Sequence, residues 1–416
     1  LKLGDRILVK SSKCKETLSL YLSSILTGSV FFPLNPSYTL NETIYFIEDS
    51  KPSILICESS EVKSIKPICD KIGCKILSLN ANGEGEVTNG LEDLDNFFKP
   101  NNRAKDDVAA LLYTSGTTGK PKGAMLTHQN LVSNALQLIN LWNIDKSDTL
   151  IHALPIYHTH GLFVAINTSM MSGATIRFIK NFNIDLVIEA FKYSTLMMGV
   201  PTFYTRLIKD KRLDRSVTKN MKLFISGSAP LLTETHQDFY NITGHQILER
   251  YGMTETNMNT SNPFDGERKV GSVGKPLKDI NIRINKTKGY KNTIHNDIGM
   301  IEIMGPNVFK GYLNNPKKTQ EAFTEDGYFI TGDIGYFDRD GYLFISGRNK
   351  DLIISGGFNV YPKEIEDVIN QHKSVIESAV FGIKDNDFGE VPIAAVVMIN
   401  DNKEIKDLSV FVENNL

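Results

Sequence analysis

The chain has 416 residues, with 46 Lys and Arg residues against 48 Asp and Glu residues and a formal net charge of −2. This length predicts two or three domains of roughly 100–200 residues, and the balanced charge argues against bulk binding to nucleic acid or anionic membranes. Hydrophobic residues at 41% and charged residues at 23% exclude a disordered chain. No apolar run approaches the roughly 18 residues that span a bilayer, so we expect a soluble protein.

The four cysteines, Cys14, Cys57, Cys69 and Cys74, are too scattered for a disulfide scaffold and lack the paired spacing of a zinc site. We expect buried thiols in a reducing compartment. The chain has no initiator Met and ends within a helical pattern, so we expect an internal part of a longer protein. The predicted location is the cytoplasm, or an organelle if a preceding segment carries a signal.

Short apolar runs alternate with amphipathic segments of helical length, which is typical of βαβ units in a parallel sheet. The alternation predicts buried strands at residues 54–57, 195–200 and 223–225, and two further apolar runs lie at 6–9, which is strand-like, and at 108–112. It predicts helices at 185–192 and 231–240, and residues 80–107 read as an exposed connection. The fold class that follows is α/β.

The pattern changes after residue 263. Short runs at 282–284, 299–304 and 342–345, separated by Gly and Asp turns, predict an antiparallel β subdomain. From residue 351 we expect a small α+β unit: a strand, a Gly-rich turn, a helix that begins near Pro362, and strands at 378–383 and 393–399.

The most informative motif is YTSGTTGKPKG at residues 113–123, directly after an apolar run. Three glycines, four hydroxyl side chains and two lysines between Thr114 and Gly123 offer backbone N–H groups, hydroxyls and positive charge, which together suit a polyphosphate. The spacing differs from the common P-loop, because only two residues separate Gly116 from Gly119 and Pro121 interrupts the motif.

This loop resembles the signature of the adenylate-forming (AMP-binding) superfamily, which includes the acyl-CoA synthetases. Three further motifs resemble that family in order and spacing: YGMTE at 251–255, YFITGD at 328–333 and GRNKDLIISGGFNVYP at 347–362. The resemblance runs from about residue 4 to the end. It implies a large N-terminal domain, 1–348, without its first segment, and an incomplete, mobile C-terminal domain, 349–416, with a hinge near Lys350.

The resemblance implies the activation of a carboxylic acid with ATP and Mg²⁺ through an acyl-adenylate, followed by transfer to the thiol of CoA as co-substrate. The residues that it implies for ATP are Thr114, Ser115, Gly116, Thr117, Thr118, Gly119, Lys122, Gly227, Ser228, Ala229, Tyr251, Gly252, Thr254, Asp333 and Arg348. Glu255 would hold the metal ion, and the residues that it implies for catalysis are Thr254, Glu255, Lys122 and His158. Taken alone, Glu255 would also suit a solvated surface acid, and Tyr251 a core aromatic residue.

The second half-reaction is assigned by resemblance to the C-terminal domain. Lys350 would be its hinge, and Ser355, Gly356 and Gly357 would form the loop that meets the thiol of CoA. The family's adenylating Lys lies beyond the last residue of this chain, and we assign no substitute. The 416 residues alone are therefore expected to adenylate weakly.

The predicted acid pocket comprises His158, His160, Ser226, Arg250 and Met253. Aryl-acid and fatty-acid relatives commonly have Gly before the motif tyrosine, where this chain has Arg250. A buried arginine without a partner costs several kcal/mol, and an anionic substrate group would compensate for it. Two structural alternatives stay open: an ion pair with Glu249, or a side chain that points outward.

Within the superfamily, the segments at 199–206 and 249–259 resemble the malonyl-CoA synthetases. We therefore expect malonate, or methylmalonate, to be converted with ATP and CoA to its CoA thioester, AMP and pyrophosphate. The expected partners are these small molecules, with no nucleic acid, no membrane insertion and no obligate protein partner. The alternatives are a CoA ligase for another short-chain or aryl acid, a peptide-synthetase adenylation domain, and a non-catalytic nucleotide-binding protein.

Overall fold

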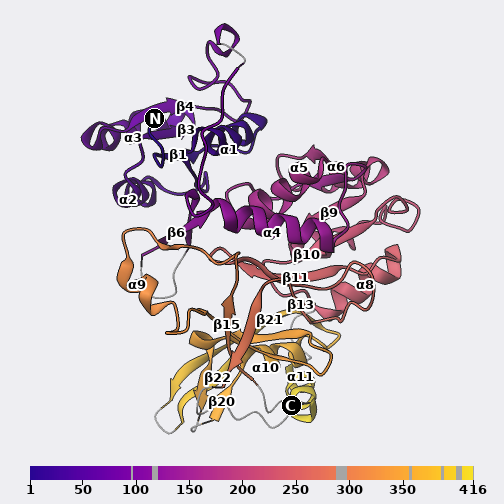
Figure 1. The fold of residues 1–416 in the computed structure, drawn as a ribbon. Coiled ribbons are helices and arrows are strands. Elements are labelled where there is room, and N and C mark those ends of the chain that lie inside the picture. Colours follow the sequence, from indigo (N-terminus) through magenta and orange to yellow (C-terminus); the bar gives the residue numbers. More distant parts are fainter. Residues whose placement is uncertain are drawn as a thin grey trace.

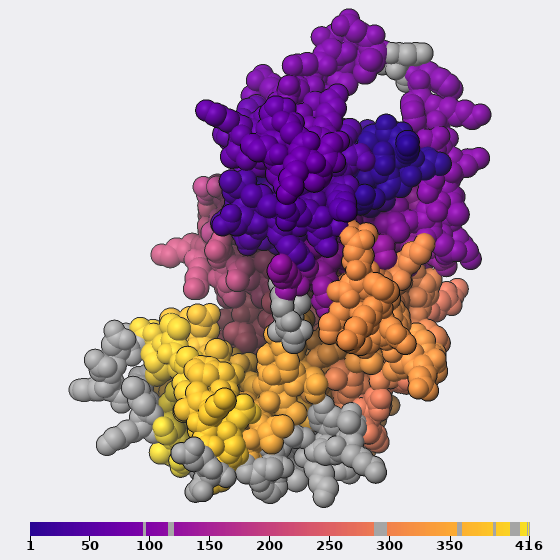
Figure 2. Space-filling view, turned by 90° about the vertical axis from the view of Figure 1, so that its left-hand side faces the viewer, coloured from indigo at the N-terminus to yellow at the C-terminus, as the bar shows by residue number. Residues whose placement is uncertain are grey.

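The computed structural model describes residues 1–94, 97–114, 120–286, 298–355, 358–385, 388–399 and 405–415. Figure 1 shows a large N-terminal domain above a small C-terminal domain, with the two ends of the chain at opposite ends of the molecule. Figure 2 shows the C-terminal domain, in yellow, below the indigo and purple N-terminal part and beside the orange β subdomain. The predicted division into a large α/β domain and a small α+β domain is confirmed.

The first sheet has seven strands in the order β16-β6-β5-β2-β1-β3-β4. Their bounds are β1 (Arg6–Lys10), β2 (Val30–Pro33), β3 (Ile54–Cys57), β4 (Lys75–Ser78), β5 (Val108–Thr114), β6 (Lys122–Thr127) and β16 (Gly311–Tyr312). Strands β1 to β5 pair in parallel, whereas β6 and β16 extend the sheet in antiparallel fashion. The helices that connect the parallel strands are α1 (Lys15–Thr27), α2 (Leu40–Ser50) and α3 (Ser59–Ile72).

The side chains of β1 show why helices cover both faces of this sheet. Ile7 and Val9 pack in one core with Tyr21 of α1, whereas Leu8 packs on the opposite face with Phe46 of α2. Successive residues of a strand point to opposite faces, so a continuous apolar run requires cover on both sides.

The second sheet has seven strands in the order β13-β12-β11-β10-β9-β7-β8. Their bounds are β7 (Thr149–His152), β8 (Thr175–Phe178), β9 (Leu196–Gly199), β10 (Leu223–Ser226), β11 (Leu248–Met253), β12 (Asn257–Ser261) and β13 (Lys275–Pro276). Its helices are α4 (His128–Leu141), the π-helix η2 (His160–Ile166), α5 (Asn167–Ser172), α6 (Ile184–Ala190), η3 (Phe191–Tyr193), α7 (Pro201–Leu207) and α8 (Thr233–Thr243). Strands β7 to β11 are parallel, so their carboxyl ends lie along one edge.

The β subdomain is an antiparallel sheet in the order β14-β15-β17-β18. Its bounds are β14 (Asn281–Asn285), β15 (Gly299–Met304), β17 (Phe329–Phe337) and β18 (Leu343–Arg348), with α9 (Pro316–Glu321) beside it. The C-terminal domain contains η4 (Asn349–Asp351), β19 (Ile353–Ser355), β20 (Phe358–Val360), α10 (Pro362–Ile369), β21 (Val375–Asp385), β22 (Gly389–Met398) and α11 (Ile405–Asn415).

The predicted strands are confirmed, and the differences lie at the ends of elements. Helix α8 begins at Thr233 and ends at Thr243, later than the predicted 231–240 at both ends. Strand β21 begins at Val375 and pairs with β22 along its whole length, because cross-strand contacts extend a hairpin beyond its apolar residues. The connection at 80–107 contains one short 3₁₀ helix, η1 (Leu91–Asp93).

All four cysteines are buried and unbridged, as predicted. Within the described residues, no group of three or more His, Cys, Asp or Glu side chains could hold a metal ion. None of the described helices combines the length and the apolar character that a membrane crossing requires.

Gly274, directly before β13 of the second sheet, lies very close to the backbone of a neighbouring segment. Gly274 has a φ of +86°, and a Cβ atom on it would lie 1.9 Å from the carbonyl carbon of Ser261. Gly271 has a similar φ of +78° but open space around its Cβ position. We expect Gly274→Ala to lower the free energy of unfolding by about 3 kcal/mol, from both backbone strain and overlap. The matched control Gly271→Ala should cost only about 1 kcal/mol.

Denaturant unfolding of both variants measures the difference. Equal losses of stability would contradict the close backbone approach at Gly274.

Candidate active site

Part of the predicted site lies at the carboxyl ends of the parallel strands of the second sheet. Ser226, the last residue of β10, pairs with Gly199 of β9 on one side and with Glu249 of β11 on the other. In parallel sheets, ligands bind in the crevice beyond the carboxyl ends of the strands. Figure 2 shows a hollow between the purple N-terminal part and the yellow C-terminal domain, and its floor has the pink of the middle of the chain.

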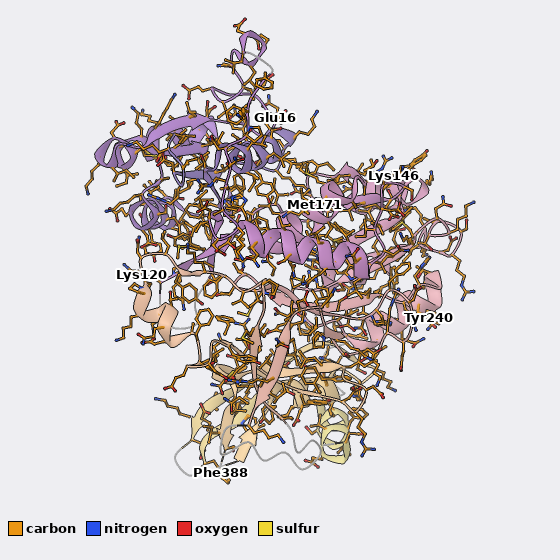
Figure 3. All side chains as sticks on the ribbon, viewed as in Figure 1. Glu16, Lys120, Lys146, Met171, Tyr240 and Phe388 are labelled. Atoms are coloured by element: carbon orange, nitrogen blue, oxygen red, sulfur yellow. The ribbon has the colours of Figure 1, made fainter. Side chains whose placement is uncertain are left out.

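The predicted phosphate loop connects β5 with β6. Thr114 and Lys122 are paired across this antiparallel hairpin, so the loop joins two adjacent strand ends. Ser115, Gly116, Thr117, Thr118 and Gly119 lie outside the described residues. Lys120, directly after the loop, lies near α9 in the view of Figure 3. Its ammonium lies 5.4 Å from the ring centre of Tyr45.

Glu255 is a buried acid and not a solvated one. Its side chain is 5% exposed, and its Oε1 accepts hydrogen bonds from Tyr312 Oη at 3.0 Å and Thr114 Oγ1 at 3.3 Å. Burial raises the pKa of Glu255, while these donors and the charge of Lys122 lower it. Lys122 lies 4.5 Å above the Tyr312 ring. The arrangement brings a carboxylate and an ammonium to the mouth of the phosphate loop.

A second cluster joins the large domain to the β subdomain. Tyr251 Oη donates to Asp333 Oδ2 at 2.5 Å, and Arg348 Nε lies 3.1 Å from Asp333 Oδ1. Asp333 and Arg348 are directly paired across β17 and β18. Burial is the largest cause that raises the pKa of Asp333, and it also raises the pKa of Tyr251. Tyr251 is therefore both a core aromatic residue and a hydrogen-bond donor to the predicted ribose-binding acid.

Arg250 is buried without a counter-charge. Its side chain is 3% exposed, and neither Nε nor Nη2 has a hydrogen-bond partner. Burial lowers its pKa to about 9, so it is still charged at neutral pH. Within the described part of the chain, no carboxylate forms an ion pair with it.

The two structural alternatives for Arg250 both fail. Its side chain is not turned outward, and Glu249 points to the opposite face of the strand. Glu249 Oε1 accepts from the backbone N–H of Gly271 at 3.3 Å and lies 4.0 Å from His236 Nδ1. Arg250 itself packs against Gly227, where a Cβ atom would lie only 2.4 Å from the guanidinium carbon.

His160 lies beside this arginine. Its Nδ1 lies 3.3 Å from the hydroxyl of Ser228, and its buried Nε2 has no partner. Burial, followed by the charge of Arg250, lowers the pKa of His160 well below its usual value, so the ring is neutral. The buried hydroxyl of Ser226 also has no partner. Ser228 has a φ of +71°, an uncommon conformation for a residue with a side chain.

The other predicted residues have less distinctive surroundings. His158 is exposed and its ring lies 4.6 Å from that of Tyr157, while Met253 and Thr254 are half-buried. Gly252 sits at a β-bulge, where a Cβ atom would meet the carbonyl oxygen of Asn257 at 1.9 Å. Lys350 lies 3.7 Å from Asp351.

Ala229 is exposed and Ser355 ends β19. Gly356 and Gly357 lie outside the described residues.

Two tyrosines near the site were not predicted. Tyr312 of β16 contacts Glu255, and Tyr204 of α7 is fully buried and donates to the backbone oxygen of Ile225 at 2.6 Å. Tyr204 lies within the segment 199–206 that resembles the malonyl-CoA synthetases but has no predicted role, and Tyr312 lies in no motif. Tyr312 is 57 residues from Glu255 in the chain, so only the fold brings the two together.

The contact between Gly227 and Arg250 predicts a thermodynamic coupling. Gly227→Ala should lower the free energy of unfolding by about 2 kcal/mol, because the new methyl group overlaps the guanidinium. In an Arg250→Gly background the same change should cost at least about 1 kcal/mol less. Denaturant unfolding of the four proteins closes this double-mutant cycle. Additive effects would contradict the packing of Arg250 against Gly227.

Comparisons with known proteins identify the family of this chain. Residues 1–313 match the AMP-binding enzyme family, and residues 364–416 match the AMP-binding enzyme C-terminal domain. The malonate–CoA ligase of Arabidopsis thaliana is 35% identical over 95% of this chain and 68% of its own length. The human mitochondrial malonate–CoA ligase ACSF3 is 32% identical over 92% of this chain and 72% of its own length.

A crystal structure of ATP-bound MatB from Rhodopseudomonas palustris superposes with a TM-score of 0.96 at 48% identity, over all of this chain and 83% of that one. The names of these relatives include malonate and ATP, which are the acid and the nucleotide that the sequence motifs predict. The chain belongs to the AMP-binding enzyme family.

Proposed function

We propose that this protein is an acid–CoA ligase that activates malonate with MgATP. One carboxylate oxygen of malonate attacks the α-phosphate of ATP and expels pyrophosphate, which gives malonyl-adenylate. The thiolate of CoA then attacks the acyl carbonyl, AMP leaves, and malonyl-CoA is formed. The names of the relatives support this reaction, since two of them are malonate–CoA ligases.

The observation that carries the proposal is the unpaired Arg250. A buried cation without a counter-charge costs several kcal/mol. An acid with a second carboxylate would supply that counter-charge, and a monocarboxylate would not. A planar guanidinium with two nitrogens, Nε and Nη2, that have no partner among the described residues matches the geometry of a carboxylate.

His160 and Ser226 would complete the clamp. If Nδ1 of the neutral His160 accepts from the Ser228 hydroxyl, its Nε2 carries the hydrogen and is a free donor. Together with the unpartnered hydroxyl of Ser226, the pocket then holds donors and a positive charge. Such a lining favours a dianion over the apolar tail of a fatty acid. We also assign His158 and Met253 to this pocket by the family resemblance.

For the nucleotide we propose the following roles. Thr114, Lys122 and the loop residues Ser115, Gly116, Thr117, Thr118 and Gly119 would hold the phosphates of ATP. Tyr251, Gly252 and the backbone of Gly227, Ser228 and Ala229 would line the adenine, and Thr254 would contact the α-phosphate. Asp333 is an acceptor-only group held by Tyr251 and Arg348, which suits the two ribose hydroxyls.

Glu255 is our candidate for the Mg²⁺ ligand. Its donor set fits a hard cation, because the carboxylate is buried and a nearby positive charge would offset the burial that raises its pKa. When bound, Mg²⁺ would neutralise charge on the phosphates during the transfer. Tyr312 and Thr114 would keep Glu255 in place, and Lys122 would add positive charge on the same side.

For the second half-reaction we propose a hinge at Lys350, between a domain of residues 1–348 and one of residues 349–416. Rotation about it would bring Ser355, Gly356 and Gly357 to the adenylate, where CoA arrives. The proposed partners are malonate, ATP and CoA. The predicted cytoplasmic location stays a prediction, and the human relative is named as mitochondrial.

The experiment is pyrophosphate release by the full-length gene product with ATP, Mg²⁺ and CoA, across malonate, methylmalonate, succinate, acetate, hexanoate and coumarate. Malonate, alone or with methylmalonate, should give the highest kcat/KM, and acetate should be at least roughly a hundredfold poorer, since it leaves Arg250 unpaired. A preference for hexanoate or coumarate would contradict the dianion pocket. The absence of pyrophosphate release with every acid, despite ATP binding, would support the alternative of a non-catalytic nucleotide-binding protein.

We expect Arg250→Met to lower the activity of the protein and to raise its stability. The change should lower kcat/KM for malonate by at least about a hundredfold, because the proposed partner of the second carboxylate is lost. It should also stabilise the protein by about 1–3 kcal/mol, since an unpaired buried charge is replaced by an apolar chain. Arg206→Met, an exposed arginine of α7, is the matched control and should change neither quantity.

Unchanged malonate kinetics in Arg250→Met would refute the carboxylate clamp. A loss of both activity and stability would mean that Arg250 is a structural residue with an intact partner.

A further inference from the structure

A buried lysine of the first sheet reaches into the second sheet. Lys13 follows β1, is 8% exposed, and its Nζ lies 2.6 Å from Ile179 O, 2.9 Å from Leu154 O and 2.9 Å from His152 O. No ion pair to a carboxylate is present for it among the described residues. His152 is the last residue of β7, while Leu154 and Ile179 lie just beyond the ends of β7 and β8, so one side chain contacts two strand ends of another sheet.

His152 connects Lys13 with the segment that leads to the predicted acid pocket. Its Nδ1 lies 2.8 Å from Lys13 Nζ, and its Nε2 lies 2.8 Å from the backbone oxygen of Gly161. Burial lowers the pKa of His152 to about 3, so the ring is neutral, with one accepting and one donating nitrogen. A carbonyl oxygen only accepts, so Nε2 bears the hydrogen and Nδ1 accepts from Lys13. Lys13 thereby selects the tautomer that binds Gly161.

The segment between these contacts lines the site. Gly161 is so close to the loop that a Cβ atom on it would lie 1.9 Å from Pro155 O. It directly follows His160, a residue that feels the charge of Arg250 and whose buried Nε2 has no partner among the described residues. The turn from Leu154 to Gly161 is therefore held at its start by Lys13 and at its end by His152. The π-helix that begins at His160 is a geometry that recurs at functional sites.

We propose that Lys13, acting through His152, is a positioning residue that sets His160 in the acid pocket. It contacts no substrate, and its effect is on where the His160 ring stands. The identity of the acid rests on the function proposed above, whereas the relay from Lys13 to His160 does not.

A second buried lysine provides a matched control. Lys10 lies on β1, is 1% exposed, and bonds to Glu61 and to Pro36 O at 3.0 Å, all within the first sheet and its helices. Lys10→Met removes an equally buried ammonium from the same segment without touching the second sheet. Comparing the Lys13 variants with Lys10→Met distinguishes a displaced His160 from a general loss of stability.

The experiment measures KM and kcat for malonate and for ATP in the full-length enzyme and in Lys13→Met, Lys13→Arg and Lys10→Met. Lys13→Met should raise KM for malonate roughly tenfold or more and leave KM for ATP within about twofold, because a displaced His160 affects the acid alone. Lys13→Arg keeps the donors and should restore part of the loss. Lys10→Met should leave both KM values unchanged even where it lowers the melting temperature.

An unchanged malonate KM in Lys13→Met, or an equal rise in both KM values, would overturn the proposal. If the wild-type enzyme prefers another acid, the proposed function fails and the same comparison is made with that acid. NMR of protein labelled with ¹⁵N-histidine provides a measurement that does not depend on enzyme activity. The His152 and His160 signals are assigned with His152→Gln and His160→Gln. The relay predicts shifted His152 and His160 signals in Lys13→Met and unshifted ones in Lys10→Met; an unshifted His160 in Lys13→Met would refute it.

Discussion

The burial of Arg250 with no counter-charge among the described residues is the constraint on which the rest of the site depends. Its guanidinium lies against Gly227, next to the neutral His160. Such an arrangement is costly in the free protein and becomes favourable when an anion enters. On the function proposed above, the pocket would favour negatively charged acids, and part of the substrate's binding energy would go to pairing this charge.

Residues that are far apart in the sequence hold Arg250 and its neighbours in place. The parallel strands of the second sheet bring Ser226 and Arg250 to one edge, and Gly227 leaves room for the guanidinium. Lys13, from the first sheet, fixes the strand ends from which the loop to His160 departs. On the nucleotide side, Tyr312 from the first sheet and Asp333 from the β subdomain meet residues of the same strand, β11, and the turn that follows it.

Much of this architecture could be predicted from sequence because it is local. Continuous apolar runs predict the strands around Leu55, Met197 and Phe224, and the Gly- and hydroxyl-rich run predicts a loop at 113–123, of which residues 115–119 lie outside the described part of the chain. Arg250 was singled out because a charged residue occupies a position where an apolar environment was expected. Its burial could not be predicted, because the sequence left an outward-pointing side chain and an ion pair with Glu249 open, and only the structure excludes them.

The rest depends on contacts between distant segments. Lys13 and His152 are 139 residues apart, and nothing in the sequence near either one signals the other. Tyr312 lies in no motif, and its role as a donor to Glu255 appears only when β16 joins the edge of the first sheet. The C-terminal end of α8 and the full length of the β21–β22 hairpin were missed because the left-handed Gly244 and cross-strand pairing, and not hydrophobicity, determine them. The start of α8 at Thr233 has no side-chain cap that explains it.

The central claim is that the free carboxylate of the bound acid pairs with Arg250. A crystal structure of the full-length protein with malonate and a non-hydrolysable ATP analogue tests it most directly. The account predicts one carboxylate directed at the α-phosphate and the other within hydrogen-bond distance of Nε or Nη2 of Arg250, with His160 beside it. An Arg250 paired instead with a protein carboxylate, or a second malonate carboxylate bound away from it, would contradict the account.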